Sequence, residues 1–173
     1  MFLLHEGLFF VAYQLYLLPV VQKETSTSQN DPDQPDIRFR HLVQDLPVAV
    51  YTCDCQGFIT YYNAAAEKLW GRSPVIGKDA WCGSWRAFDA EGNTVSFDRG
   101  PVAIALKEGR SVRGVEYIVE RPDGKRLNVL PHPDPIRDEK GNISGAVSMV
   151  VDITDHKKIF NIICNLQYAI ITS

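Results

Sequence analysis

Four short turns constrain the fold of this chain more than any other feature of its sequence. Residues 54–57, 89–92 and 138–141 have the form Asp-x-x-Gly, and residues 121–124 read Arg-Pro-Asp-Gly. In such a turn the aspartate side chain bonds backbone NH groups, and the glycine accepts the positive φ that closes the turn. Turns this tight join antiparallel strands. We therefore expect an antiparallel sheet.

The segments beside these turns have the composition of strands. They are rich in β-branched and aromatic residues, which strands favour. Their order along the chain is a hairpin, a gap and a three-stranded meander. The five predicted strands lie at residues 49–53, 58–62, 112–120, 125–130 and 143–153.

The gap between the second and third strands has helix signals. Asn63 is a good N-cap, residues 64–70 favour a helix, and Gly71 ends it. Residues 101–109 form a second predicted helix, with Pro101 in the first turn, where proline is tolerated. Because a lone sheet leaves its apolar side in water, these helices must cover one face. The predicted fold class is α+β: a five-stranded antiparallel sheet with helices on one face, flanked by terminal helices.

This order of elements resembles the PAS fold, and the resemblance covers about residues 36–158. Residues 81–85 and 129–133 are similar to a subgroup attached to bacterial sensor kinases. The motifs similar to PAS domains in general are D-x-x-G-x-I-x-Y-x-N-x-A-A at 54–66, E-R-P-D-G at 120–124 and D-I-T at 152–154.

The resemblance implies a sensory module that transduces signals and is not an enzyme. PAS domains bind small ligands between the sheet and the helices, dimerise, and pass signals to effectors such as histidine kinases of two-component systems. The alternative is a PAS-like interaction scaffold whose aromatic side chains fill the core and leave no room for a ligand. The side chains expected to line a pocket are Tyr51, Trp70, Trp81, Trp85, Phe88 and Tyr117.

The same resemblance assigns the signal junction to Asp152, Ile153 and Thr154, followed by an output helix over residues 156–173. We expect Asp152 to accept hydrogen bonds from nearby backbone NH groups or from Lys157 or Lys158. A terminal helix that packs on its own sheet remains open, because the a/d pattern lasts only about two heptads. That pattern comprises Ile159, Ile162, Leu166 and Ala169.

Haem and flavin are disfavoured, and the cofactor stays unknown. Haem-binding PAS domains use a histidine on the helix before the third strand, and residues 101–109 contain none. Flavin photosensors resemble G-x-N-C-R-F-L-Q, and the sequence around Cys82 lacks the Asn, Arg and Gln of that motif.

Metal binding and thiol catalysis are the remaining chemical options. Cys53, Cys55, Cys82 and His132 match no zinc spacing, so no metal site is expected. An enzyme would use Cys82 as nucleophile and His132 as its base, within hydrogen-bond reach of each other. His132 stands between two prolines, where a structural or solvent-facing role is favoured.

Charge and cysteine usage bear on partners and compartment. The 18 Lys and Arg residues are scattered among 21 Asp and Glu residues, so no nucleic-acid footprint is expected. The four cysteines contain no CxxC pair and predict reduced thiols in the cytoplasm.

The chain divides into four predicted segments. Residues 1–22 are apolar, 23–36 form a polar linker, 37–155 form the PAS domain, and 156–173 follow it. The most apolar stretch, 7–21, is short for a bilayer core of about 30 Å. It has no preceding Lys or Arg and is a poor signal peptide. A marginal membrane anchor, an amphipathic helix that contacts a partner or a second copy, and an incidental extension all remain open.

Overall fold

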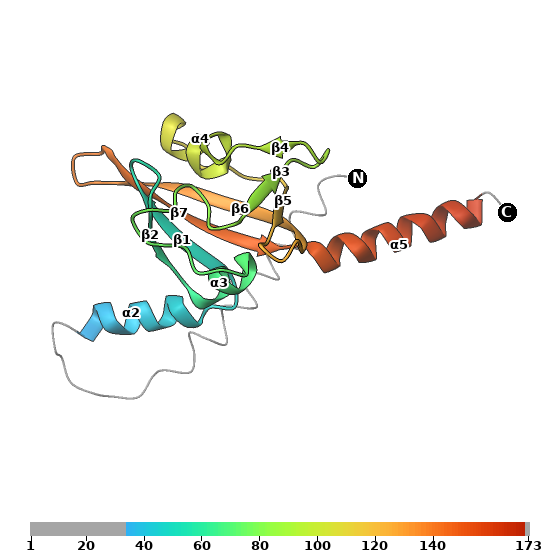
Figure 1. The fold of residues 1–173 in the computed structure, drawn as a ribbon, viewed down its shortest axis with the longest axis horizontal. Helices are drawn as coiled ribbons and strands as arrows, with labels where there is room; N and C mark the ends of the chain where they lie inside the picture. Colours follow the sequence, from blue (N-terminus) through green and yellow to red (C-terminus); the bar gives the residue numbers. More distant parts are fainter. Residues whose placement is uncertain (1–33, 172–173) are drawn as a thin grey trace. The chain divides into compact units, whose positions relative to one another are not determined.

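The computed structural model describes residues 34–171 (Figure 1). The predicted apolar segment 1–22 and most of the predicted linker therefore lie outside the described residues. The first described element is helix α2, Gln34–Asp45, so the last three residues of the predicted linker are helical. Across the part of the chain that is described, no helix is long and apolar enough to cross a membrane.

One antiparallel sheet organises the unit formed by residues 37–173. Its spatial order is β2-β1-β7-β6-β5-β3-β4, so the last strand of the chain lies in the interior of the sheet beside the first (Figure 1). The predicted α+β class is confirmed. The strands are β1 (Ala49–Asp54), β2 (Ile59–Tyr62), β3 (Arg86–Phe88), β4 (Thr94–Val95), β5 (Tyr117–Glu120), β6 (Arg126–Arg137) and β7 (Ile143–Asp152).

The sheet has two strands more than the five predicted. β3 and β4 flank the predicted turn at 89–92, and β3 pairs with β5 through Ala87 and Val119. They span only three and two residues, too few to show the alternation that identifies a strand in a sequence. The predicted strand 112–120 is also wrong in its first half. β5 begins at Tyr117, because Gly114 has a φ of +70° that extended backbone does not accommodate.

β6 is longer than predicted and carries prolines at 131, 133 and 135. The Pro133 carbonyl accepts the Val112 N–H at 3.2 Å and the Arg113 guanidinium at 3.0 Å, so it faces away from β7. Alternating positions of a strand face the same neighbour, so all three missing N–H groups lie on that side. Pairing between β5 and β6 accordingly ends at Val129. Beyond it, the prolines are tolerated because the side of β6 that faces away from β7 has no described strand that needs their backbone N–H groups.

Both predicted internal helices are present, as α3 (Ala64–Trp70) and α4 (Pro101–Glu108). A short 3₁₀ helix, Phe97–Arg99, precedes α4. Asn63 caps α3 and is fully buried, and its amide group bonds four backbone groups. Its Oδ1 accepts the N–H groups of Val50 and Ala66, and its Nδ2 donates to the carbonyls of Val43 and Val48, at 2.9 to 3.0 Å.

The core lies on one face of the sheet, between the strands and these two helices. Tyr51 of β1 faces Ser148 of β7 directly, and Trp70 of α3 packs edge-on against Tyr51 with ring centroids 5.1 Å apart. Val102 and Leu106 of α4 belong to the same buried cluster. The prediction that helices cover one face is therefore confirmed.

Helix α5, Thr154–Ile171, follows β7 directly and begins two residues before the predicted start of the output helix. Four of its apolar side chains are exposed by 47–59 %: Ile159, Phe160, Ile162 and Ile163. Over these positions the helix does not pack on its own sheet (Figure 1). The side chains of Leu166 and Ala169, the other predicted seam positions, lie outside the described residues.

Candidate functional site

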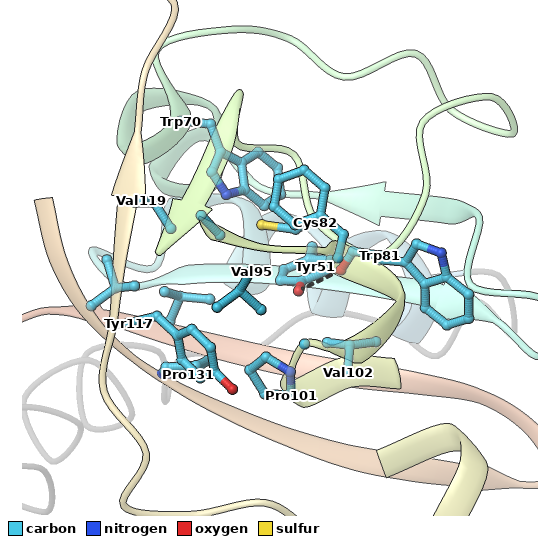
Figure 2. Close-up of a pocket in the computed structure, with 15 residues that line it drawn as sticks. Tyr51, Trp70, Trp81, Cys82, Val95, Pro101, Val102, Tyr117, Val119 and Pro131 are labelled. Atoms are coloured by element: carbon cyan, nitrogen blue, oxygen red, sulfur yellow. Dashed lines mark hydrogen bonds between the residues drawn. The ribbon is translucent and has the colours of Figure 1, made fainter. Parts of the chain in front are cut away.

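A cavity of about 50 Å³ lies between the sheet and its helices (Figure 2). Of the six aromatic residues predicted to line a pocket, Tyr51, Trp70, Trp81 and Tyr117 surround it. They come from β1, α3, the loop before β3, and β5, so the fold brings together residues that are far apart in the sequence.

The other two predicted residues, Trp85 and Phe88, are not among those that line this cavity. Trp85 is 56 % exposed. Phe88 is buried, but Ala87 is the residue of β3 that faces the cavity, so its neighbour Phe88 faces the other side of the sheet. There the guanidinium carbon of Arg126 lies 4.1 Å from the Phe88 ring centroid.

Sequence reasoning missed most of the aliphatic lining. Strand alternation and pairing contain the signal for part of it: Val119 alternates with Tyr117 in β5, and Val129 of β6 pairs with Tyr117. Val95, Phe97 and Pro101 come from β4, the 3₁₀ helix and the start of α4, whose approach to the sheet depends on tertiary packing. The missed residues are Cys82, Ala87, Val95, Phe97, Gly100, Pro101, Val102, Val119, Val129, Pro131 and Val150.

Trp81 has an unusual backbone conformation at the cavity wall. Its φ is +67°, a left-handed conformation that a bulky residue rarely adopts. Two hydrogen bonds hold it: the Trp81 N–H donates to the Gly57 carbonyl at 2.7 Å, and the Tyr51 hydroxyl donates to the Trp81 carbonyl at 3.0 Å (Figure 2). A Cβ atom at Gly57 would collide with the Trp81 ring. The hairpin thus fixes one side of the cavity.

The lining of the cavity is uncharged and mainly apolar. No Lys, Arg, His, Asp or Glu is among its lining residues. Burial, and then the neighbouring Cys82 and Cys53, raise the pKa of Tyr51 well above its usual value. Although Ser148 lies close enough to lower the pKa of Tyr51 slightly, its buried hydroxyl makes no hydrogen bond of acceptable geometry within the described residues.

The buried thiols have the wrong electrostatics for nucleophilic catalysis. Burial raises the pKa of Cys82, whose Sγ lies 3.0 Å from the Ser84 hydroxyl, and raises the pKa of Cys53 to about 12. A reactive cysteine needs a lowered pKa, because the thiolate is the nucleophile. Both thiols are therefore protonated at neutral pH.

His132 does not join Cys82. Pro131 faces the cavity with Cys82, and the next residue of a strand faces the opposite side of the sheet. Burial and the nearby Arg113 guanidinium lower the pKa of His132. Among the described residues no cluster of three or more His, Cys, Asp or Glu side chains could hold a metal ion.

The cavity does not fit haem or flavin. No histidine is available in its lining to ligate an iron, and no Asn or Gln is present to bond a flavin ring. Its volume of about 50 Å³ is also far below the ~300–1,000 Å³ of ordinary ligand and cofactor pockets.

The predicted junction forms a compact hydrogen-bond network. Asp152 Oδ1 accepts the Thr154 N–H at 2.9 Å, as expected for a backbone donor. The Ile153 N–H donates to the Asn128 carbonyl at 2.8 Å, and the Asn128 N–H donates to Thr154 Oγ1 at 2.9 Å. Ile153 itself is buried. These contacts attach the start of α5 to β6.

Lys157 and Lys158, the basic side chains considered as partners of Asp152, pair elsewhere. Lys157 forms an ion pair with Glu116, just before β5, and Lys158 pairs with Asp155 at 2.9 Å on the same helix. The first of these pairs gives α5 a second attachment to the sheet, beside Tyr117.

Comparison with known proteins agrees with this architecture. The family model described as PAS fold matches residues 37–153. No curated protein matches the chain. A structure of an RNA-binding light-oxygen-voltage receptor is 22 % identical with a TM-score of 0.57, over 84 % of this chain and 41 % of its own. This chain thus spans less than half of that receptor.

Two further structures match over nearly their whole length. The PAS domain of a protein from Colwellia psychrerythraea is 23 % identical with a TM-score of 0.54, over 70 % of this chain and 99 % of its own. A sensory box histidine kinase/response regulator from Burkholderia thailandensis is 17 % identical with a TM-score of 0.53, over 79 % of this chain and 99 % of its own. At these identities the likeness establishes the fold alone.

Proposed function

The chain belongs to the PAS family, and from this premise we propose that it is a signal-input module which binds a small molecule, dimerises and signals through α5. PAS domains are in general sensory modules rather than enzymes. The effector in this proposal is a protein such as the histidine kinase of a two-component system. The cavity is the input site, and α5 is the output element.

The observation that carries the proposal is the position of the two attachments of α5. Asn128, which bonds Ile153 and Thr154, is the neighbour of cavity-lining Val129 in β6. Glu116, which pairs with Lys157, is the neighbour of cavity-lining Tyr117. A molecule that displaces β5 or β6 in the cavity therefore shifts a group that holds the first turn of α5.

Dimerisation through α5 is supported by its unpartnered apolar side chains. Ile159, Ile162 and Ile163 follow the i, i+3, i+4 spacing of one helix face, and all are exposed. Exposed apolar patches on soluble proteins usually mark contacts with other chains. Pairing with α5 of a second copy would remove this face from water.

The proposed compartment is the cytoplasm, and the proposed partners are proteins rather than nucleic acids. All four cysteines are free, which suits a reducing compartment. A net charge of −3 with scattered basic residues does not favour nucleic-acid binding. Membrane association through residues 7–21 is retained as an alternative. The proposed division of the chain is into residues 1–22, 23–36, 37–155 and 156–173.

A second function, an interaction scaffold without a ligand, is favoured by the small volume of the cavity. Native mass spectrometry of the purified full chain separates the two. The sensor predicts a dimer that carries extra bound mass, released on denaturation, and the scaffold predicts a dimer of the bare polypeptide mass. A monomer at high concentration would contradict both. An absorbance spectrum of the same sample, expected to lack haem and flavin bands, tests the cofactor proposal.

A further inference from the structure

The cavity has a thin partition on one side. A second, open depression of about 400 Å³ is lined by Asp89, Ala90, Glu91, Val95, Gly114, Val115, Glu116 and Tyr117. Val95 and Tyr117 line both spaces, so these two side chains lie between the cavity and the outer depression. The class of ligand that these two spaces select rests on the proposed ligand-binding function.

The partition is made of weakly held parts. Val95 belongs to the two-residue strand β4 at the edge of the sheet. Tyr117 is half-buried and is the first residue of β5, directly after a segment that does not pair as a strand.

The two spaces differ in charge. The outer depression carries the carboxylates of Asp89, Glu91 and Glu116 and no basic lining residue, and of these three Glu116 is paired with Lys157. The cavity carries no charged side chain at all. An anion would be repelled at the entrance and would lose its hydration inside with no cation to replace it, a cost of several kcal/mol. A neutral apolar molecule meets neither barrier.

We propose that the cavity takes a small, uncharged, mainly apolar molecule of a few non-hydrogen atoms, which enters from the acidic depression past Tyr117 and Val95. An apolar cavity of ~150 Å³ holds a benzene-sized molecule, so about 50 Å³ limits the ligand to something smaller. Tyr51 and Tyr117, whose hydroxyl groups are polar, belong to the lining of the cavity.

Methyl NMR of the full chain tests the size and apolarity of the site, with xenon as the first probe. Val95, Val102, Val119, Val129 and Val150 line the cavity, and Val147 and Val151, which alternate with Val150 in β7, face the opposite side of the sheet. Xenon should shift the methyl signals of the first five and leave those of Val147 and Val151 unchanged. Unmoved cavity valines in a folded protein would overturn the proposal.

A matched pair of probes, 1-propanol and propionate, tests the charge requirement. We expect propionate to bind at least about tenfold more weakly than 1-propanol, equivalent to about 1.4 kcal/mol. Equal affinities, or tighter propionate binding, would contradict an uncharged ligand even though the cavity would remain a binding site.

The entrance is tested with Tyr117→Ala, which removes the larger half of the partition. Exchange of 1-propanol should become about tenfold faster than in the unmodified chain. Ile118→Ala, one residue along β5 and on the other face, should leave the rate unchanged. Equal rates in both variants would show that ligands enter elsewhere and would overturn the proposed route.

The same samples distinguish failure of this inference from failure of the proposed function. If the chain dimerises through α5 but no probe enters the cavity, the inference fails and the ligand-free scaffold stands. If 1-propanol enters the cavity of a monomeric chain, the ligand class stands and the proposed signalling through α5 fails.

Discussion

Helices α4 and α5 both carry apolar side chains, but α4 buries them and α5 exposes them. α4 buries Val102, Ala103, Ala105 and Leu106 against the sheet. α5 is attached only near its start among the residues described, and it leaves a row of isoleucine and phenylalanine side chains in water. Both helices are rich in apolar residues, so their apolar composition alone does not explain why one is buried and the other exposed.

The difference lies in what each helix can reach. α4 lies across the covered face of the sheet, where its apolar side meets β6 and β7. α5 continues beyond the end of β7, and its later turns have no strand beneath them (Figure 1). Apolar side chains in α4 should therefore stabilise the domain, whereas those of α5 should matter only when a second chain is present.

Leu106→Ala should give the largest effect on the domain itself. Leu106 is buried in the core cluster, and such a truncation leaves a cavity that costs about 2–5 kcal/mol. Urea unfolding followed by tryptophan fluorescence measures the change. Ile104→Ala, a half-buried position of the same helix, is the matched control and should cost clearly less. Equal losses would mean that α4 does not have one distinct core face.

Asp152→Ala should have a moderate and local effect. It removes the acceptor of the Thr154 N–H, and the loss of such a cap costs about 1 kcal/mol. Hydrogen exchange across residues 153–165 should accelerate severalfold while exchange in the sheet stays the same. Asp155→Ala, whose carboxylate forms an ion pair with exposed Lys158, is the control. Unchanged exchange in 153–165 would mean that Asp152 does not hold the junction.

Lys157→Gln should have a smaller effect, because the ion pair between Lys157 and Glu116 is half-exposed. Exposed ion pairs contribute about 0–1 kcal/mol and weaken with added salt. A double-mutant cycle with Glu116→Gln, read by hydrogen exchange at the start of α5, isolates the pair. Lys158→Gln combined with Glu116→Gln is the control and should show no coupling. Coupling of that control pair would disprove the specific link between Glu116 and Lys157.

Ile162→Glu should have the smallest effect on the monomer, within about 0.5 kcal/mol, since the side chain is already 58 % exposed. In the proposed dimer the same change buries a charge in the contact and should abolish self-association. Sedimentation equilibrium measures the dimer, and unfolding at low concentration measures the monomer. Asn161→Glu, the adjacent exposed position, is the control. A dimer that survives Ile162→Glu would place the contact elsewhere.

Local signals predicted the regular elements well. The Asp54 and Asp138 turns form as expected, with the aspartate Oδ1 accepting backbone N–H groups of its own loop at 2.8 to 2.9 Å. Asn63 caps α3, and Gly71 ends it with a φ of 66°. Each of these interactions spans only a few residues, so the sequence window contains both partners.

The candidate site was predicted less well, for a reason visible at β3. A one-residue difference in strand phase decides whether Phe88 or Ala87 faces the cavity, and only pairing of Ala87 with Val119 sets that phase. In the same way, Tyr117 faces the cavity because β5 pairs with β6 from that residue onward. No local pattern of the sequence contains these pairings.

The sequence by itself determined the antiparallel sheet, its turns, the two covering helices and the helical continuation after Asp152, because short-range hydrogen bonding and chain stereochemistry specify them. The tertiary structure alone decided the size of the cavity, the partition at Val95 and Tyr117, and the exposure of α5. The physical reason is that a cavity is a small remainder of a densely packed interior. It depends on how distant elements approach one another, which local preference does not specify.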